Sequence, residues 1–232
     1  MIQSGLYFDL IAACREAGCP ICRLVARAID RYLDTMLNDA IADADVELRF
    51  VASRGLCQRH AAPIVDRSGS AVSTAYLHRA VIDNVLSSIK GEVDVIDHAL
   101  RRKWPGTERQ RFLAAMLNPH RECPACEQQA AIEHMTLSEL GKYVFEPEFV
   151  EAFEESSGLC LPHFRQALTL TRDERAALRL IELQREHFMR LRDQLAEFIR
   201  KNADRFSGEG FGAEGDSWLR AIGIVSGQKD AQ

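Results

Sequence analysis

The chain has 232 residues, of which 47% are apolar and 27% are charged, and its formal net charge is -5. This balance is typical of a soluble globular protein and excludes a disordered or fibrous one. The negative charge argues against a protein whose whole surface follows a phosphate backbone. No leader or membrane-spanning run occurs, so the sequence predicts a cytoplasmic protein that does not bind membranes.

The first part of the chain predicts helices. Apolar spacing favours helices over residues 5–17, from Pro20 to about Ala44, over 46–53 and over 56–66. Residues 71–103 predict one long helix or two stacked ones. Trp104, Pro105 and Gly106 then predict a hinge between two halves.

The second part predicts the same order of elements. Helices are expected over 124–141, 148–156, 164–170 and 172–202, the last with a charged outer face. A glycine-rich acidic tail follows, in which Asp216 is expected to cap a final helix. No alternating β-branched run suggests a strand, so the fold class predicted is all-α.

Six of the seven cysteines belong to a pattern that occurs twice. Cys-Pro-x-Cys is followed by Gly-Leu-Cys-x-x-His, and the second copy lies 104 positions after the first at the paired cysteines and 103 at the Cys/His pair. The regular spacing predicts an internal duplication with halves 1–104 and 105–232. The eight predicted metal ligands are Cys19, Cys22, Cys57, His60, Cys123, Cys126, Cys160 and His163.

Each copy supplies three thiols and one imidazole, which is a complete tetrahedral ligand set for zinc. Cys19 is expected at a helix N-cap with Cys22 one turn later, where the helix dipole favours thiolates. Cys57 and His60 lie three residues apart and share one helix face. The sequence therefore predicts about two structural zinc ions per chain, whose loss unfolds each half.

Two arrangements of these ligands are open. Each site could form within one half, or the paired cysteines of one half could join the Cys/His pair of the other. The 33 or 34 residues between the two motifs suit a helical hairpin that brings its ends together. We therefore expect each half to be closed by its own Cys3His site.

Other chemistry fits the cysteines less well. An iron–sulfur cluster is the main alternative cofactor, because three cysteines and a histidine can hold one. A redox dithiol would follow a strand in a βαβ unit, and covalent haem would need histidine where Arg23 and Glu127 stand. If the six cysteines were only buried apolar residues, there would be no reason for a histidine to follow them at the same spacing in both copies.

The remaining polar residues have simpler interpretations. Cys14 is expected to be a buried helix residue. The tail residues Glu209, Glu214 and Asp216 could serve a second metal or a substrate, although a capped loop explains them equally well. Ordinary surface or core positions are expected for His78, His98, His120, His134 and His187.

The two motifs and the ending Glu214-Gly215-Asp216-Ser217-Trp218 identify a resemblance that covers nearly the whole chain. The chain resembles a prokaryotic family catalogued only as domain of unknown function 6062. The resemblance implies that the tail belongs with the Cys/His units. It implies no activity, substrate or partner.

The predicted function is a non-enzymatic metal-binding scaffold that binds another macromolecule, with a protein as the expected partner. The alternatives are an iron–sulfur or redox-sensing protein and an enzyme that uses the acidic tail. Nucleic-acid binding through Arg101, Arg102 and Lys103 is disfavoured by the overall charge.

Overall fold

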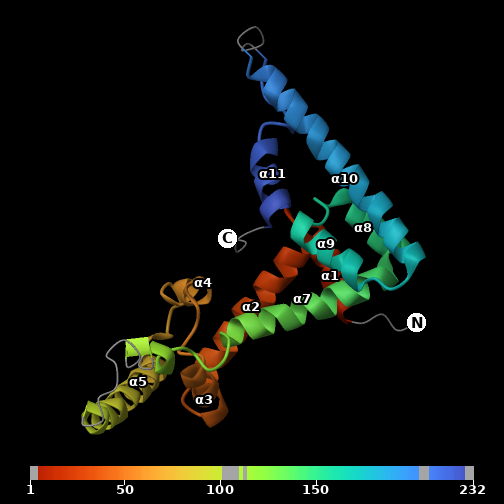
Figure 1. Ribbon diagram of the computed structural model, residues 1–232. Coiled ribbons are helices and arrows are strands. Elements are labelled where there is room, and N and C mark those ends of the chain that lie inside the picture. The colour runs from red at the N-terminus through yellow and green to blue at the C-terminus, as the bar shows by residue number, and fades with distance from the viewer. Residues whose placement is uncertain (1–4, 101–109, 112–113, 204–208, 228–232) are drawn as a thin grey trace. The chain divides into compact units, whose positions relative to one another are not determined.

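The computed structural model describes residues 5–100, 110–111, 114–203 and 209–227, with side chains except over 90–100. Within those ranges every regular element is helical and no strand occurs, which confirms the all-α prediction (Figure 1). The elements are α1 (Gly5–Cys14), α2 (Pro20–Asp39), α3 (Ala44–Ala52), α4 (Gln58–Ala61), the 3-10 helix η1 (Ala62–Ile64), α5 (Ala71–Leu100), α7 (Pro124–Tyr143), α8 (Pro147–Glu155), α9 (Leu161–Leu170), α10 (Glu174–Lys201) and α11 (Ser217–Ser226).

Two helices end at other residues than predicted, each for a local reason. Helix α2 ends at Asp39, before the expected Ala44, because Asp43 caps α3 and its carboxylate accepts a hydrogen bond of 2.8 Å from the Asp45 N–H. The helix expected over 56–66 is the short α4 followed by η1, since Pro63 lacks an N–H for a continuing α-helix. The expected hinge at residues 104–106 lies outside the described residues.

The chain divides into two compact units. Unit 1 contains residues 1–28 and 131–232, and unit 2 contains residues 29–130. Helix α2 therefore begins in unit 1 and ends in unit 2, whereas α7 begins in unit 2 and ends in unit 1. The boundaries between the two units lie after residues 28 and 130, whereas a boundary was expected between residues 104 and 105.

Aromatic side chains form much of the core of unit 1, where α1 packs against α8 and α11 lies beside α10 (Figure 1). Tyr7 meets Tyr143 edge-on with ring centroids 5.1 Å apart. Phe149 and Phe153 stack at 5.6 Å within α8, and both rings are buried. This aromatic row fixes α8, the helix that leads into the turn carrying Cys160.

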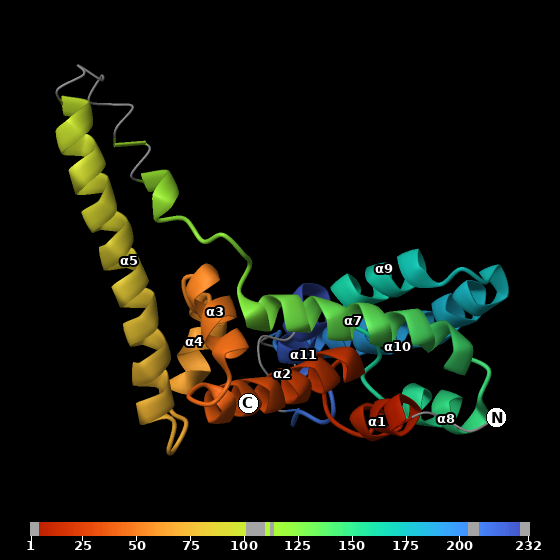
Figure 2. The ribbon, with the colours of Figure 1, turned by 90° about the horizontal axis from the view of Figure 1, so that it is seen from below.

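Unit 2 has its core between α3 and α5, which lie side by side (Figure 2). Phe50 of α3 is 1% exposed, and Leu77 and Val81 of α5 are buried with it. The apolar face of α3 thus holds the start of the turn that carries Cys57.

No helix among the described residues is both long enough and apolar enough to cross a lipid bilayer.

Phe149 provides a test of the aromatic core. Phe149→Ala removes a fully buried ring and should lower the free energy of unfolding by about 3–5 kcal/mol. Phe145→Ala is the matched control, because that ring is 53% exposed and its loss should cost less than about 1 kcal/mol. Urea unfolding followed by circular dichroism measures both, and equal effects would contradict this description of the core.

Candidate metal centres

The first cluster of ligand atoms lies in unit 1 and comprises Cys19, Cys22, Cys160 and His163. Its ligand atoms all lie within 4.8 Å of one another. The Nδ1 atom of His163 is 3.5 Å from Cys19 Sγ, 3.4 Å from Cys22 Sγ and 3.2 Å from Cys160 Sγ. Cys22 Sγ and Cys160 Sγ are 3.8 Å apart. Four ligand atoms thus surround one small volume.

The second cluster lies in unit 2 and comprises Cys57, His60, Cys123 and Cys126. The Nδ1 atom of His60 is 3.4 Å from both Cys57 Sγ and Cys126 Sγ, and 3.7 Å from Cys123 Sγ. The sulfurs of Cys57 and Cys126 are 3.7 Å apart. All eight predicted ligands therefore fall into two Cys3His clusters that could each hold a metal ion.

The expectation that each half closes its own site is wrong. Cys19 and Cys22 join Cys160 and His163, and the other two pairs join likewise. Helix α2 has 20 residues and carries the chain about 26 Å from Cys22 to the helix end at Asp39. Helix α3 has only 9 residues, about 14 Å, so it covers about half of that distance, and Cys57 lies in the other cluster. Helices α7 and α8 differ in length in the same way, with 20 and 9 residues, and Cys126 and Cys160 likewise lie in different clusters.

Each Cys-Pro-x-Cys motif opens a helix, as predicted. Cys19 directly precedes α2, and its carbonyl accepts the first helical hydrogen bond, from the Arg23 N–H at 3.1 Å. The carbonyl of Cys123 accepts from the Glu127 N–H at 3.0 Å at the start of α7. Proline at the first helical position costs no hydrogen bond there. Both sulfurs of a motif consequently lie at the positive end of a helix.

The Cys-x-x-His motifs are also helix starts. Cys57 is the N-cap of α4 and Cys160 the N-cap of α9, both with extended backbone. In each motif the histidine lies three residues, about one helical turn, after the cysteine. Its Nδ1 atom therefore lies beside the cysteine sulfur. Each cluster is therefore formed where two helices begin.

A serine and a glycine shape the turn before each of these N-caps. Ser53 and Ser156 are buried at the ends of α3 and α8, and the Ser156 hydroxyl donates to the Phe153 carbonyl at 2.6 Å. Gly55 and Gly158 follow with φ of +90° and +70°, a conformation that glycine adopts without steric cost. The turn lets the chain reverse within a few residues and present the cysteine.

A buried glutamine holds the turn of the unit 1 cluster. The side-chain amide of Gln184 on α10 donates to the Leu159 carbonyl at 3.0 Å and accepts from the Leu159 N–H at 2.8 Å. Gln184 is fully buried, so these bonds satisfy polar groups that water cannot reach. Helix α10 thereby fixes the backbone next to Cys160.

The crowded thiols influence one another's ionisation. Burial and the neighbouring thiols raise the pKa of Cys19, whereas hydrogen bonds from Cys160 and Cys19 lower the pKa of Cys22. In unit 2, burial and Cys57 raise the pKa of Cys126 to about 12. Several thiolates close together repel one another. A cation bound among them would allow all three to ionise.

The two clusters differ in what surrounds the histidine. In unit 1 the Nε2 atom of His163 lies 3.7 Å from a carboxylate oxygen of Glu133. In unit 2 the Nε2 atom of His60 lies 3.4 Å from a guanidinium nitrogen of Arg59. A carboxylate behind a ligating histidine orients the ring and makes it a better donor to metal.

The remaining cysteine is placed as predicted. Cys14 is 2% exposed on α1 and lies outside both clusters. Burial raises the pKa of its thiol to about 12.

Two of the other histidines have a role in packing. His78 meets Phe50 edge-on and His187 meets Phe153 edge-on, with ring centroids 5.3 and 5.1 Å apart. His78 is exposed and His187 is buried. His187 also packs against the backbone of Gly158. Its place beside this turn had no local sequence signal, because the contact joins residues far apart in the chain.

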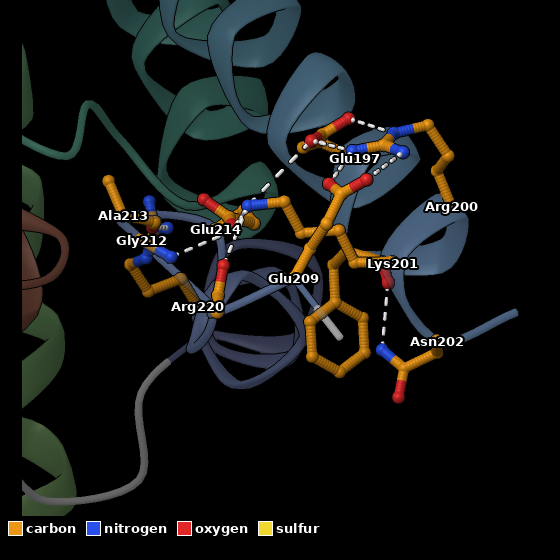
Figure 3. A network of polar contacts seen from close by, with 11 residues as sticks. Glu197, Arg200, Lys201, Asn202, Glu209, Gly212, Ala213, Glu214 and Arg220 are labelled. Carbon is orange, nitrogen blue, oxygen red and sulfur yellow. Dashed lines mark hydrogen bonds and ion pairs between the residues drawn. The ribbon is translucent and has the colours of Figure 1, made fainter. Parts of the chain in front are cut away.

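The acidic tail is held by cations of α10 (Figure 3). The carboxylate of Glu214 accepts from the Gly212 N–H at 2.8 Å and from Lys201 Nζ at 2.7 Å, and together they lower its pKa to about 2. Arg200 pairs with both Glu197 and Glu209. Glu209 and Glu214 therefore fix the tail on α10.

Asp216 takes the predicted N-cap position of α11, but its side chain makes no capping hydrogen bond. It accepts instead from Arg220 at 2.8 Å. Neither it nor the other tail carboxylates belong to a metal cluster within the described residues.

Residues 10–232 match the sequence profile of a family described as "Family of unknown function (DUF6062)". A protein from Caldicellulosiruptor sp. (strain Rt8B.4), described as "Uncharacterized 23.9 kDa protein in xynA 3'region", is 24% identical over 215 residues. The match covers 92% of this chain and 97% of that protein. No solved structure gives a significant match.

The two turn glycines should differ in their tolerance of a side chain. A Cβ on Gly158 would lie 2.7 Å from His187 Cγ, whereas one on Gly55 would lie 3.6 Å from the Phe50 ring. Gly55→Ala should cost about 1–2 kcal/mol from its backbone conformation alone. Gly158→Ala should cost about 2 kcal/mol more, because a buried ring must move. Urea unfolding of both metal-loaded variants tests this difference, and equal costs would contradict it.

Proposed function

The chain belongs to this family of unknown function, and we propose that it is a scaffold protein in which each Cys3His cluster binds one structural zinc ion. The observation that carries the proposal is the spacing of the ligand atoms. Around a tetrahedral zinc, sulfur atoms lie about 3.8 Å apart, and sulfur and nitrogen about 3.6 Å. One sulfur pair in each cluster is 3.8 or 3.7 Å apart, the sulfur–nitrogen pairs span 3.2–3.7 Å, and all ligand atoms of a cluster lie within 4.8 Å of one another.

The same spacing disfavours an iron–sulfur cluster. Such a cluster places several irons and sulfides between its protein ligands. Its ligand atoms must therefore lie farther apart than those around one ion, whereas all four atoms of each cluster here lie within 4.8 Å. A single tetrahedral ion fits this volume better.

The ligand set favours a structural metal over a catalytic one. Four protein ligands fill the coordination sphere of zinc and leave no position for water or substrate. The alternative enzyme site in the tail is weakened by its contacts, because Glu209, Glu214 and Asp216 each pair with a cation of the same unit. Binding of another macromolecule by the scaffold stays a prediction.

Metal analysis tests the proposal directly. Protein purified without added metal should contain about two zinc ions per chain, and removal by a strong chelator should abolish cooperative unfolding. Binding energies of about 10–16 kcal/mol per zinc match or exceed the roughly 5–15 kcal/mol that stabilises a domain. Elemental analysis and circular dichroism provide the measurements. Iron with sulfide, or a metal-free chain that stays folded, would refute the proposal.

Paired cysteine variants test which ligands share a metal. Cys22→Ser and Cys160→Ser belong to one cluster, so each alone and both together should leave about one zinc per chain. Cys22→Ser combined with Cys57→Ser disrupts both clusters and should leave none. Sites formed within each half would give the opposite result for the two double variants. Titration of the metal-free variants with Co²⁺ checks the count independently of zinc retained during purification.

A further inference from the structure

The two Cys3His clusters differ in how far solvent reaches their sulfur atoms. In unit 1, Cys19 and Cys160 are 1% and 0% exposed, and Cys22 is partly exposed. In unit 2 all three cysteines of the cluster are partly exposed. The shell around a metal site controls the access of solvent and of competing ligands. The unit 2 cluster is therefore the more open of the two.

The end of α11 adds to the cover of the unit 1 cluster. A Cβ on Gly227, the residue that follows this helix, would lie 3.9 Å from Cys160 Sγ and 3.8 Å from Pro162 Cγ. Helix α11 is held in place by its packing against both α9 and α10. A competing ligand that approaches Cys160 from this side must first displace the end of α11.

The clusters also differ at the histidine nitrogen that faces away from the sulfur atoms. Nδ1 of each histidine lies among the sulfurs, so Nδ1 is the ligand atom. A metal-bound imidazole is neutral and keeps its hydrogen on Nε2. In unit 1 a carboxylate oxygen of Glu133 lies 3.7 Å from Nε2 of His163, a distance at which the negative oxygen attracts that N–H. This contact supports the metal-bound form of the ring.

In unit 2 the corresponding contact is with a donor. A guanidinium nitrogen of Arg59 lies 3.4 Å from Nε2 of His60, and the same nitrogen donates to the side-chain oxygen of Gln129, which anchors it. A guanidinium has only donors. Two donors therefore face each other when Nδ1 of His60 holds a metal ion. Without metal, the ring hydrogen can move to Nδ1 and Nε2 can accept from Arg59, so this contact favours the metal-free ring.

Longer-range charge acts in the opposite direction. A zinc ion with three thiolates has one net negative charge, which attracts Arg59 and repels Glu133. Arg59 is exposed, so water and salt screen its charge. Partners such as a carboxylate behind a zinc-bound histidine typically contribute about 10–100-fold to metal affinity, even though a carboxylate carries the unfavourable charge. The direct contact with Nε2 therefore decides the difference between the clusters.

We propose that the two zinc ions are held unequally, so that the unit 1 cluster retains its zinc while the unit 2 cluster exchanges zinc with the surrounding solution. This inference rests on the proposed function, in which each cluster binds a structural zinc ion. A structural zinc supports the fold around it. The folding of unit 2 then depends on the zinc supply, whereas unit 1 stays folded when zinc is scarce.

Stepwise removal of zinc from the full zinc-loaded chain at pH 7 tests the proposal. A chelator that changes colour on binding zinc should remove one zinc per chain at least about tenfold faster than the other. Iodoacetamide is added when one zinc has left, and peptide mass spectrometry then locates the label. We expect it on the three cysteines of the unit 2 cluster and not on those of the unit 1 cluster. The chain with both zinc ions gives the background labelling.

Variants behind the two histidines test the cause. Arg59→Gln replaces donors by a side chain that also offers an acceptor, so the fast release should become about tenfold slower and the slow release should not change. Arg79→Gln is the matched control, because Arg79 is an exposed arginine of unit 2 that pairs with Asp83. It should release zinc as the parent does.

Glu133 provides the reciprocal test in unit 1. Glu133→Ala should make the slow release about tenfold faster, and Glu133→Gln, which keeps an acceptor oxygen, should restore most of the loss. A purely structural role of Glu133 would not change the release of this zinc alone.

The outcomes separate this inference from the proposed function. Two zinc ions that leave together, or label that appears first on the unit 1 cysteines, would overturn the inference and leave zinc binding intact. Unchanged release from Arg59→Gln would overturn the role given to Arg59. A chain that binds no zinc would refute both proposals.

Discussion

The convergence of cysteine and histidine side chains from distant parts of the chain is the constraint on which the rest of the structure depends. In unit 1 the contacting ligands are separated by 138 to 144 residues, and in unit 2 by 63 to 69 residues between motifs. Closing such long loops has a considerable entropic cost. A metal ion bound in a cluster would oppose this cost by joining four side chains at one point.

The ligands converge because each motif lies where a helix begins. A helix start provides a defined backbone direction, a residue one turn later on the same face, and a partial positive charge. Two helix starts that face each other therefore provide four ligand atoms with little further adjustment. Gly158 and Gln184 complete the arrangement in unit 1, the first by letting the chain turn close to His187 and the second by holding Leu159.

The helices and the residue types of the two clusters could be predicted from the sequence, because both depend on local patterns. Apolar spacing, the prolines after Cys19 and Cys123, and the three-residue Cys/His spacing are all short-range signals. The pairing of the motifs was predicted wrongly, because it depends on the lengths of the helices between them and not on the motif spacing alone. A helix of 20 residues followed by one of 9 cannot return to its start.

Other features of the structure had no local signal. The hydrogen bonds of Gln184 to Leu159 and the burial of His187 beside Gly158 arise only once α10 packs against the turn. The tail carboxylates looked equally suited to a ligand site or a cap, and the position of Lys201 in space gives Glu214 a partner. Apolar periodicity and motif spacing do not predict tertiary contacts of this kind.

The crossed ligand sets also have a consequence for synthesis. A ribosome releases the chain from its N-terminus, and domains fold as they emerge. Cys19, Cys22, Cys57 and His60 all precede Cys123 in the chain, so they emerge before the ligand set of either cluster is complete. Those four residues supply three thiols and one imidazole, the same ligand types as either native cluster. A metal ion bound by those four residues would have to be exchanged between ligand sets before the native clusters could form.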